Sequence, residues 1–568
     1  MRLALLAVGL SFSAFAQISD LAVSDDGQTV LFRSGFRLQT ETDLGTQGKI
    51  YRYQNGQWTR VAAALDFGGF AISPPDVFQP FFTSDPSIFG WQINIGCSLC
   101  QIIVGPYRSS QLSGVALPQG FPRSNLSVSH NGRYFIADSV PFGGPKYLDI
   151  ATGVVTNVPV DQFAPVIRQV ANDGTAVILV TSPADKQQQA IPGALSRWLP
   201  GSEPRPIYAE TFVAGISLSA TGGMLAIETA ARTGADAGER NLLVIDTNTG
   251  ERTLVAPLPA GGWSGLYVSQ AAWDTSGTNL IYRAFDDRGQ PASIAIWSAA
   301  TRQSRTLATH DEGFASIAIS GDGGTVWAAT QSNRVVRIDA AKGATDEVLP
   351  PLGVVTSVDQ IGVPGSAVLL RGSGFTKTQQ AFDGSTILPQ SDISTDGYWA
   401  QIPWEYNAGP ATPRTVTVRI PGNPFESIAH VSIHTILQPD FAYVSAGRGY
   451  LKAAHDDFSS LVTTGNPAHP GETIHVYMTG LGPLDQPLAT GQPGPFSPPA
   501  KPLAPVTCQF FGGPSLDVPF ADYAAGMIGI YQVDVTMPDM LPDKNQTDFR
   551  CSAAGVATGA WLPTTSAR

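Results

Sequence analysis

Apolar and polar positions alternate around a recurring glycine turn in the first 350 residues. Apolar residues lie four positions before the glycine and three and five positions after it; around Gly27 these are Val23, Val30 and Phe32. This period of two beside a turn of Ser, Asp, Asn and Gly is typical of a β-hairpin. The copies of the turn are Ser24–Gly27, Ser129–Gly132, Ala171–Gly174, Ser219–Gly222, Asp274–Gly277 and Ser320–Gly323.

A third and a fourth strand follow most copies of the hairpin, as in Lys49–Gly56 and Trp58–Val61. The glycine spacings are 105, 42, 48, 55 and 46 residues, so the first gap holds two units. Its degenerate copy is expected around Phe70–Ser73, with Trp91–Ile95 and Gln101–Val104 as later strands. Four antiparallel strands at this period predict a seven-bladed β-propeller over residues 17–350. A solenoid of β-repeats is the alternative, but it would need parallel rungs.

The repeat also resembles a known family. The S-x-D-G hairpin followed by an I-D-x-x-T-G strand, here Ile245–Gly250, is similar to the TolB-type, WD-like propeller repeats of secreted bacterial proteins. That family includes binding and assembly propellers as well as propellers fused to peptidases. The resemblance therefore implies the fold and leaves the function open.

Two further domains are expected after the repeat stops at Pro350–Pro351. The phrase P-G-x-x-V-x-L-x-G-x-G-F at Pro364–Phe375 resembles the opening of IPT/TIG-type immunoglobulin-like domains, which we place at residues 351–437. The phrases Pro470–Pro483 and Gly526–Pro538 resemble the core of a C-terminal domain of unknown function in secreted acidobacterial proteins, placed at 438–568. Ala454–Phe458 departs from the Asn/Asp-Gly-like turn usual in that family, which puts a site there in doubt. The predicted fold is thus all-β, a propeller followed by two β-sandwich-like domains.

The N-terminus has the parts of a secretory signal peptide. Arg2 precedes an apolar run from Leu3 to Phe15, and Ala14-Phe15-Ala16 supplies an A-x-A end. We predict that residues 1–16 are cleaved and that the mature chain begins at Gln17. No later stretch is apolar for long enough to span a bilayer. The protein is therefore expected to be secreted, in the periplasm or outside the cell, without a transmembrane helix.

Composition supports this interpretation and excludes some partners. The 568 residues include 59 glycines and 44 prolines, and only 14% are charged. Many short strands joined by turns fit this composition better than a helical bundle does. The formal net charge is −12, which argues against a nucleic-acid partner, since such a partner requires a clustered basic face.

The four cysteines form two pairs in the sequence. Cys508 and Cys551 lie in the C-terminal region, and a structural disulfide is the expected pairing. Cys97 and Cys100 form a C-x-x-C after Gly96, without the βαβ pattern of a redox motif. A small-loop disulfide is favoured there over a catalytic dithiol.

The sequence contains none of the common catalytic motifs. It has no G-x-S-x-G nucleophile elbow, no H-E-x-x-H and no phosphate-binding loop. His430 and His434 lie four residues apart, but in a strand and a loop rather than on a helix, so they are interpreted as surface or sandwich histidines and not as a metal-binding pair. Asp25-Asp26 is interpreted as a pair of turn residues. We therefore predict no catalytic residue, metal ligand or cofactor.

Two functions of different class follow. The first is a secreted, non-catalytic binding or scaffold protein with an unknown protein or polysaccharide as ligand, in which the C-terminal domains are spacers or attachment modules. The alternative is a carbohydrate-active hydrolase or lyase with its site in the propeller mouth. Propeller enzymes rarely carry a local motif, so the side chains that line the mouth distinguish the two. Several converging carboxylates, His or Tyr there would favour the enzyme.

Overall fold

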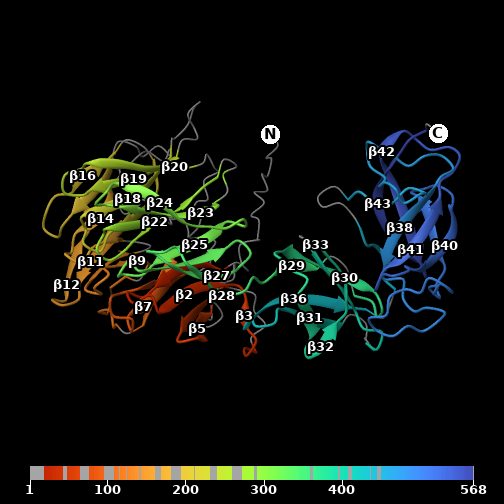
Figure 1. The fold of residues 1–568 in the computed structure, drawn as a ribbon, viewed down its shortest axis with the longest axis horizontal. Helices are drawn as coiled ribbons and strands as arrows, with labels where there is room; N and C mark the ends of the chain where they lie inside the picture. The colour runs from red at the N-terminus through yellow and green to blue at the C-terminus, as the bar shows by residue number, and fades with distance from the viewer. Residues whose placement is uncertain are drawn as a thin grey trace. The chain divides into compact units, whose positions relative to one another are not determined.

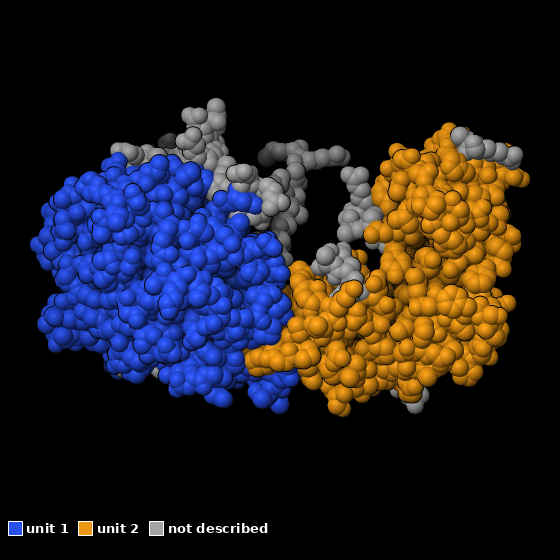
Figure 2. Space-filling model, viewed as in Figure 1, with its two compact units in different colours: residues 1–351 blue, residues 352–568 orange. Residues whose placement is uncertain are grey.

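The chain is all-β in the part that the structure describes, which confirms the predicted fold class (Figure 1). This computed structural model describes residues 18–42, 48–63, 76–94, 108–113, 115–119, 121–122, 124–139, 143–159, 168–180, 194–209, 212–230, 240–258, 271–286, 289, 291–358, 362–394, 397–406, 412–434, 437–443 and 449–566. The chain divides into two compact units, residues 1–351 and 352–568, which we call the propeller unit and the C-terminal unit (Figure 2).

The propeller unit is built from antiparallel sheets whose strands are consecutive in the chain. The first sheet has β1 (Ser19–Val23), β2 (Thr29–Ser34), β4 (Lys49–Gln54) and β5 (Gln57–Ala63), with β3 (Arg37–Leu38) between β2 and β4 in the sequence. A seven-stranded sheet follows, with β6 (Asp76–Phe82), β7 (Phe89–Asn94), β8 (Arg108–Ser113), β9 (Ser124–Val128), β10 (Tyr134–Ser139), β11 (Gly143–Asp149) and β12 (Val154–Asn157).

Four four-stranded sheets complete this unit. They are β13 (Arg168–Val170), β14 (Ala176–Val180), β15 (Ala194–Trp198) and β16 (Arg205–Tyr208); β17 (Phe212–Leu218), β18 (Met224–Ala230), β19 (Arg240–Asp246) and β20 (Arg252–Leu258); β21 (Ala271–Trp273), β22 (Asn279–Ala284), β23 (Ser293–Ser298) and β24 (Gln303–Thr309); and β25 (Phe314–Ile319), β26 (Thr325–Thr330), β27 (Val335–Asp339) and β28 (Thr345–Leu349).

The second repeat differs in detail from the sequence prediction. Its first hairpin is β6–β7 with the turn Thr83–Ser87, which lacks glycine and uses Pro86, so the glycine pattern could not find it. A single residue pair, Ser109 with Ser124, joins β8 to β9 and merges two expected units into one sheet. Phe70–Ser73 and Gln101–Val104 lie outside the described residues. The count of seven blades stays a prediction.

The first strands of successive repeats contact one another, and a hydrogen bond from Ser84 N to His130 O (2.6 Å) joins the turns after β6 and β9, so the repeats form a closed ring. β1 contacts both β6 and β25, β13 contacts β9 and β17, and β21 contacts β17 and β25. The first and last sheets meet, and among the described strands none is exchanged between them. Their contact includes hydrogen bonds from Ile18 N to Asn333 Oδ1 (3.0 Å) and from the Trp327 indole to Gly27 O (3.0 Å). This arrangement is a β-propeller, and its first strands surround the axis.

The apolar alternation along each strand fills the spaces between neighbouring sheets. On β18, Leu225 and Ile227 pack in one cluster with Val177 of the preceding sheet. Ala226 faces the other way and packs with Leu280 of the following sheet. Successive side chains of a strand point to opposite faces, so one strand contributes to two cores.

The C-terminal unit contains two pairs of sheets. The first pair is β29 (Val354–Val358), β30 (Ala367–Ser373), β34 (Gly397–Gln401) and β33 (Gln390–Ser394), with β36 (Phe425–Ile433), β35 (Thr412–Arg419), β31 (Gln380–Asp383) and β32 (Thr386–Leu388). The second pair is β37 (Asp440–Phe441), β38 (Thr473–Thr479), β41 (Tyr531–Thr536) and β40 (Asp517–Tyr523), with β39 (Val506–Phe510), β42 (Lys544–Ala553) and β43 (Val556–Thr564).

Each pair of sheets has its own apolar core, and a third cluster connects the pairs. Leu369 and Trp399, on β30 and β34, pack with Ile530 beside β41. Gln401 Nε2 also donates to the Tyr523 hydroxyl over 3.0 Å. The two regions are thus packed together within this unit, whereas the domain limits at 351–437 and 438–568 and the two family resemblances stay predictions.

Candidate functional site at the axial turns of the propeller

In the recurring turn, the side chains of the first and third residues are hydrogen-bonded to each other. Ser24 Oγ donates to Asp26 Oδ1 over 2.6 Å and accepts a hydrogen bond from Thr29 N at 3.0 Å. The bond from Ser24 lowers the pKa of Asp26, so this carboxylate stays charged. Ser129 and Asn131 repeat the pattern, with 2.6 Å between Oγ and Oδ1. The second residue of each turn is therefore left to interact outside its own hairpin.

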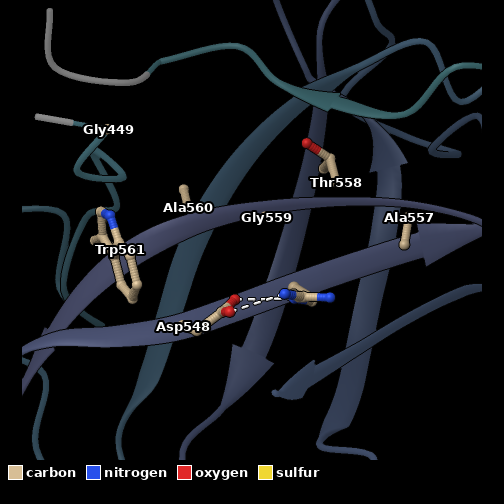
Figure 3. Close-up of a pocket in the computed structure, with 8 residues that line it drawn as sticks. Gly449, Asp548, Ala557, Thr558, Gly559, Ala560 and Trp561 are labelled. Atoms are coloured by element: carbon tan, nitrogen blue, oxygen red, sulfur yellow. Dashed lines mark hydrogen bonds and ion pairs between the residues drawn. The ribbon is translucent and has the colours of Figure 1, made fainter. Parts of the chain in front are cut away.

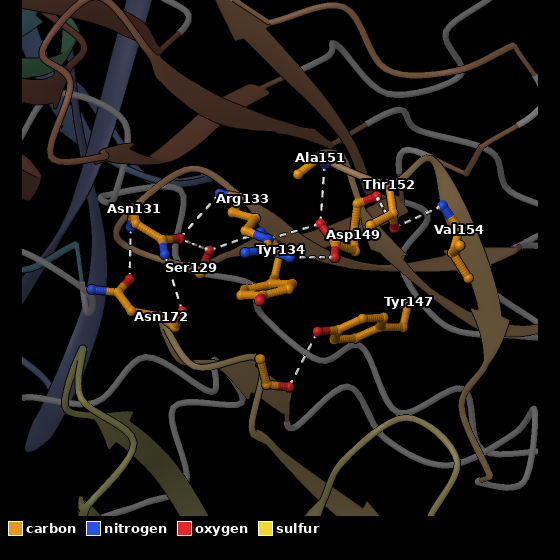
Figure 4. Close-up of polar contacts among 11 residues, drawn as sticks. Ser129, Asn131, Arg133, Tyr134, Tyr147, Asp149, Ala151, Thr152, Val154 and Asn172 are labelled. Carbon is orange, nitrogen blue, oxygen red and sulfur yellow. Dashed lines mark hydrogen bonds and ion pairs between the residues drawn. The ribbon is translucent and has the colours of Figure 1, made fainter.

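These second-position residues are bonded to one another around the axis. They are Asp25, Ser84, His130, Asn172, Ala220, Thr275 and Gly321. Ser84 N donates to His130 O (2.6 Å), Asn172 N to Ala220 O (2.8 Å), Thr275 N to Gly321 O (3.0 Å), and Asp322 N to Asp25 O (3.2 Å). Asn131 N donates to Asn172 Oδ1 over 2.7 Å (Figure 4). Backbone and side-chain bonds thus connect turns of different repeats at one end of the propeller.

Three polar side chains of this ring meet. His130 Nε2 lies 2.9 Å from Asp25 Oδ1 and 3.0 Å from Asp25 Oδ2. Thr275 Oγ1 lies 3.4 Å from both Asp25 Oδ1 and His130 Nε2. The Asp25 side chain is 38% exposed and that of His130 is 22% exposed, so solvent reaches the pair.

Gly321 leaves the space that this cluster occupies. A Cβ at position 321 would lie 2.0 Å from Asp25 Oδ1 and 2.4 Å from Thr275 Oγ1. Both separations are far below van der Waals contact, so a side chain at position 321 would displace the carboxylate from His130. The last repeat thus places a residue without a side chain at this position, which leaves room for Asp25 and Thr275.

The geometry of the cluster is not that of a proton relay. In a Ser-His-Asp triad, one imidazole nitrogen binds the carboxylate and the other binds the nucleophilic hydroxyl. Here Asp25 and Thr275 both approach Nε2 of His130, so they compete for one nitrogen. The arrangement can donate and accept hydrogen bonds and can attract a cation, but it does not pass a proton from Thr275 to Asp25 through the ring.

An acidic rim surrounds the cluster. The third residues of the turns are all exposed: Asp26, Asp85, Asn131, Asp173, Thr221, Ser276 and Asp322. Hydrogen bonds from Ser87 lower the pKa of Asp85, as Ser24 does for Asp26. Arg133, which follows the third turn, forms a bidentate pair with Asp149 at 2.9 and 2.8 Å (Figure 4). Its charge is therefore neutralised locally, and the rim presents carboxylates to solvent.

The sequence identified these turns but not their convergence. From the sequence, Asp25 and Asp26 are predicted to be turn residues, and His130 is assigned no role. The prediction holds for Asp26, whose carboxylate is hydrogen-bonded within its own turn. A feature of the sequence that could have indicated the cluster is that Asp25, His130 and Thr275 all occupy the second position of the repeated turn. Residues 105 and 250 positions apart in the chain meet there because the ring closes.

The predicted disulfide between Cys508 and Cys551 is present, on directly paired residues of β39 and β42. Cys97, Cys100 and the predicted signal peptide at residues 1–16 lie outside the described residues. His430 is on β36 and His434 follows it. In the described ranges, no three His, Cys, Asp or Glu side chains are grouped to hold a metal ion. No helix in those ranges has the length and apolar character needed to cross a bilayer.

No family model and no curated protein matches the chain. Among solved structures it is similar to an oligogalacturonate lyase from Vibrio parahaemolyticus, with 11% identity over 56% of this chain and 86% of that chain and a TM-score of 0.35. It is also similar to the β-propeller domain of the Trilobed protease from Pyrococcus furiosus (10%, 59% and 99%, TM-score 0.38). A putative TolB from Agrobacterium tumefaciens is another (15%, 39% and 79%, TM-score 0.28). The propeller assignment rests on the sheets and ring contacts of this chain.

Proposed function

We propose that this chain is a secreted, non-catalytic binding or scaffold protein that presents the turn end of its propeller to a partner. In this proposal, the C-terminal unit is a spacer or attachment module. The observation that carries it is the cluster of Asp25, His130 and Thr275, in which the side chains bind one another at a single imidazole nitrogen. A preformed and partly exposed polar ring supports recognition better than proton transfer.

The charge of the rim indicates the kind of partner. Four of the seven third-position residues are aspartates, and Asp25 lies inside them. Carboxylates on rigid turns attract a basic surface and orient it during association. We therefore propose a protein partner with exposed Lys or Arg, in preference to a neutral polysaccharide, as the ligand of this end.

Site-specific crosslinking tests this proposal. Asp322 lies in the turn after β25, and Asp311 lies in the loop before β25, so the two exposed aspartates mark opposite ends of one strand. A photoreactive side chain is placed at position 322 or, as the matched control, at position 311 of the full chain, which is then exposed to the extracellular fraction of the producing cells. We expect a discrete, salt-sensitive adduct from position 322 and none from position 311.

Two results would overturn the proposal. One is an adduct confined to position 311, which would place recognition at the other end of the propeller. The other is cleavage of a polysaccharide by the purified chain that His130→Gln abolishes. That result would establish the carbohydrate-active alternative.

A further inference from the structure

A second concave site lies on the outer face of the β42–β43 hairpin, in the C-terminal unit. It is a pocket of about 400 Å³ lined by Gly449, Asp548, Arg550, Ala557, Thr558, Gly559, Ala560 and Trp561 (Figure 3). Pockets that bind small ligands have volumes of this order. The site is separate from the axial turns and takes no part in the function proposed above.

The register of the hairpin brings an aromatic ring and a charged pair onto one face. Asp548 pairs with Trp561, and Arg550 pairs with Gly559. Directly opposed residues of antiparallel strands project to the same side of the sheet. Gly559 has no side chain to cover Arg550, since even a Cβ there would lie 3.3 Å from Arg550 Cγ. The small residue therefore keeps the space beside the Trp561 indole open.

The charged pair is fixed and neutral as a unit. Arg550 Nε and Nη2 donate to Asp548 Oδ1 and Oδ2, each over 2.9 Å. The guanidinium also lies 4.0 Å from the centre of the Phe511 ring, which holds its plane. Arg550 is 40% exposed and Asp548 is 29% exposed. Three guanidinium N–H groups and the outer carboxylate lone pairs are not used within this pair.

The Trp561 indole supplies an apolar surface next to these groups. Trp561 is 39% exposed. The backbone on either side of the ring is fixed, because Trp561 N donates to Gly449 O and Leu451 N donates to Trp561 O, both over 2.9 Å. The pocket thus combines the aromatic ring of Trp561 with a polar pair in which Arg550 can donate and Asp548 can accept hydrogen bonds.

Charge and polarity select the ligand class. A cation or an anion would have to compete with the bidentate pair, and a purely apolar ligand would leave the polar edge unsatisfied. A pyranose ring has an apolar C–H face and a periphery of hydroxyls that donate and accept. We propose that this pocket binds a neutral saccharide unit, with the sugar face on Trp561 and vicinal hydroxyls on Asp548 and Arg550.

Affinity electrophoresis of the full-length chain tests the proposal. The probes are hydroxyethyl cellulose, xylan, galactomannan and soluble chitin oligomers, each included in a native gel. We expect retardation by at least one probe, and at least tenfold weaker binding for Trp561→Ala. Gly559→Val, which fills the hollow and keeps the indole, should lose binding to the same extent. Arg550→Lys keeps the positive charge but lacks the planar guanidinium that bonds Asp548 through two N–H groups, and it should bind several-fold more weakly.

The matched control is Phe496→Ala, which removes another exposed aromatic ring of the same unit, 84% exposed, away from the pocket. It should bind like the parent chain. The proposal is wrong if no neutral probe retards the chain, if Trp561→Ala and Gly559→Val bind normally, or if Phe496→Ala loses binding equally. Crosslinking from position 322 should be unchanged in Trp561→Ala, so failure at one site is distinguishable from failure at the other.

Discussion

The propeller unit and the C-terminal unit build their candidate sites in different ways. In the propeller unit, sheets that are far apart in the chain each contribute the same turn position, and the site appears where Asp25, His130 and Thr275 meet. In the C-terminal unit, one hairpin supplies Asp548, Arg550 and Trp561 from paired positions. The cluster in the propeller unit forms only if the ring of sheets closes, whereas the site in the C-terminal unit depends only on the pairing of two neighbouring strands.

The two units also differ in what stabilises them. Both units contain apolar cores and largely buried polar pairs. In the propeller unit Arg240 Nη2 lies 3.2 Å from Glu228 Oε2, and in the C-terminal unit His455 Nδ1 lies 2.9 Å from Glu472 Oε2 and His475 Nδ1 lies 2.7 Å from Asp534 Oδ1. Within the described residues, the C-terminal unit also has the Cys508–Cys551 disulfide. Five changes to the chain, ordered from the largest expected effect to the smallest, test this difference.

Replacing both Cys508 and Cys551 by Ala should destabilise the C-terminal unit by about 4 kcal/mol, the loop-closure value for a disulfide across 43 positions. Hydrogen exchange read by mass spectrometry should show faster exchange in β38 and β41 and unchanged exchange in β17 and β18. Thr507→Ala, at an exposed position next to Cys508, is the control and should change stability by less than about 0.5 kcal/mol. Equal loosening of both units would contradict the comparison.

Gly372→Ala should cost the C-terminal unit about 3 kcal/mol, since a Cβ at this position would lie 1.6 Å from the Val354 carbonyl oxygen. The backbone of the β29–β30 pair would have to separate. Gly465→Ala is the control, because no atom lies within 4 Å of its Cβ position. Denaturant unfolding of both variants measures the difference, and similar midpoints would show that β29 is not needed for this unit.

Gly321→Ala should cost the propeller unit about 1–2 kcal/mol and separate Asp25 from His130. Gly223→Ala is the matched control, because the nearest atom to its Cβ position is 3.7 Å away, an ordinary contact. The chemical shifts of the His130 imidazole in NMR spectra at one fixed pH report the separation. If these signals are the same in Gly321→Ala and the parent chain, the axial cluster is not formed in solution.

Asp522→Asn should stabilise the C-terminal unit at neutral pH by about 1 kcal/mol. Asp522 is 1% exposed, and its carboxylate oxygens have no hydrogen-bond partner in the structure. Burial raises the pKa of Asp522 in the folded chain. The folded state therefore binds this proton more tightly than the unfolded state, and stability falls as the pH rises through the raised pKa.

Melting temperatures of Asp522→Asn and the parent chain between pH 4 and pH 8 measure this effect. The two curves should lie closest at the acid end and separate as the pH rises. Asp517→Asn, an exposed aspartate on the same strand β40, should follow the parent chain at every pH. Destabilisation by Asp522→Asn at neutral pH would mean that the carboxylate has a partner.

Cutting the chain after Pro350 should have the smallest effect on the propeller. Residues 17–350 contain all the described strands of the ring, so we expect this fragment to fold alone and to melt cooperatively, within a few degrees of the transition in the full chain. Calorimetry of the fragment and the full chain makes the comparison. An insoluble fragment would show that the propeller unit does not fold independently.

The sequence alone was sufficient to predict the hairpins, because turn chemistry and period-two alternation are local properties. The first and third turn residues Ser24 and Asp26 bond as such turns require. The Cys508–Cys551 disulfide was also predictable, since both cysteines lie in one short region. The turn Thr83–Ser87 was missed because Pro86 replaces the glycine signal there.

Only the tertiary structure decided which distant residues share a site. No pattern within a repeat indicates that Asp25 meets His130, because that contact depends on the rotation of each sheet about the axis and on ring closure. The pocket beside Trp561 likewise depends on the exact pairing of β42 with β43, since a shift of one residue would place Asp548 and Trp561 on opposite faces. Local periodicity determined the strands of this protein, and the long-range geometry of their packing determined its candidate sites.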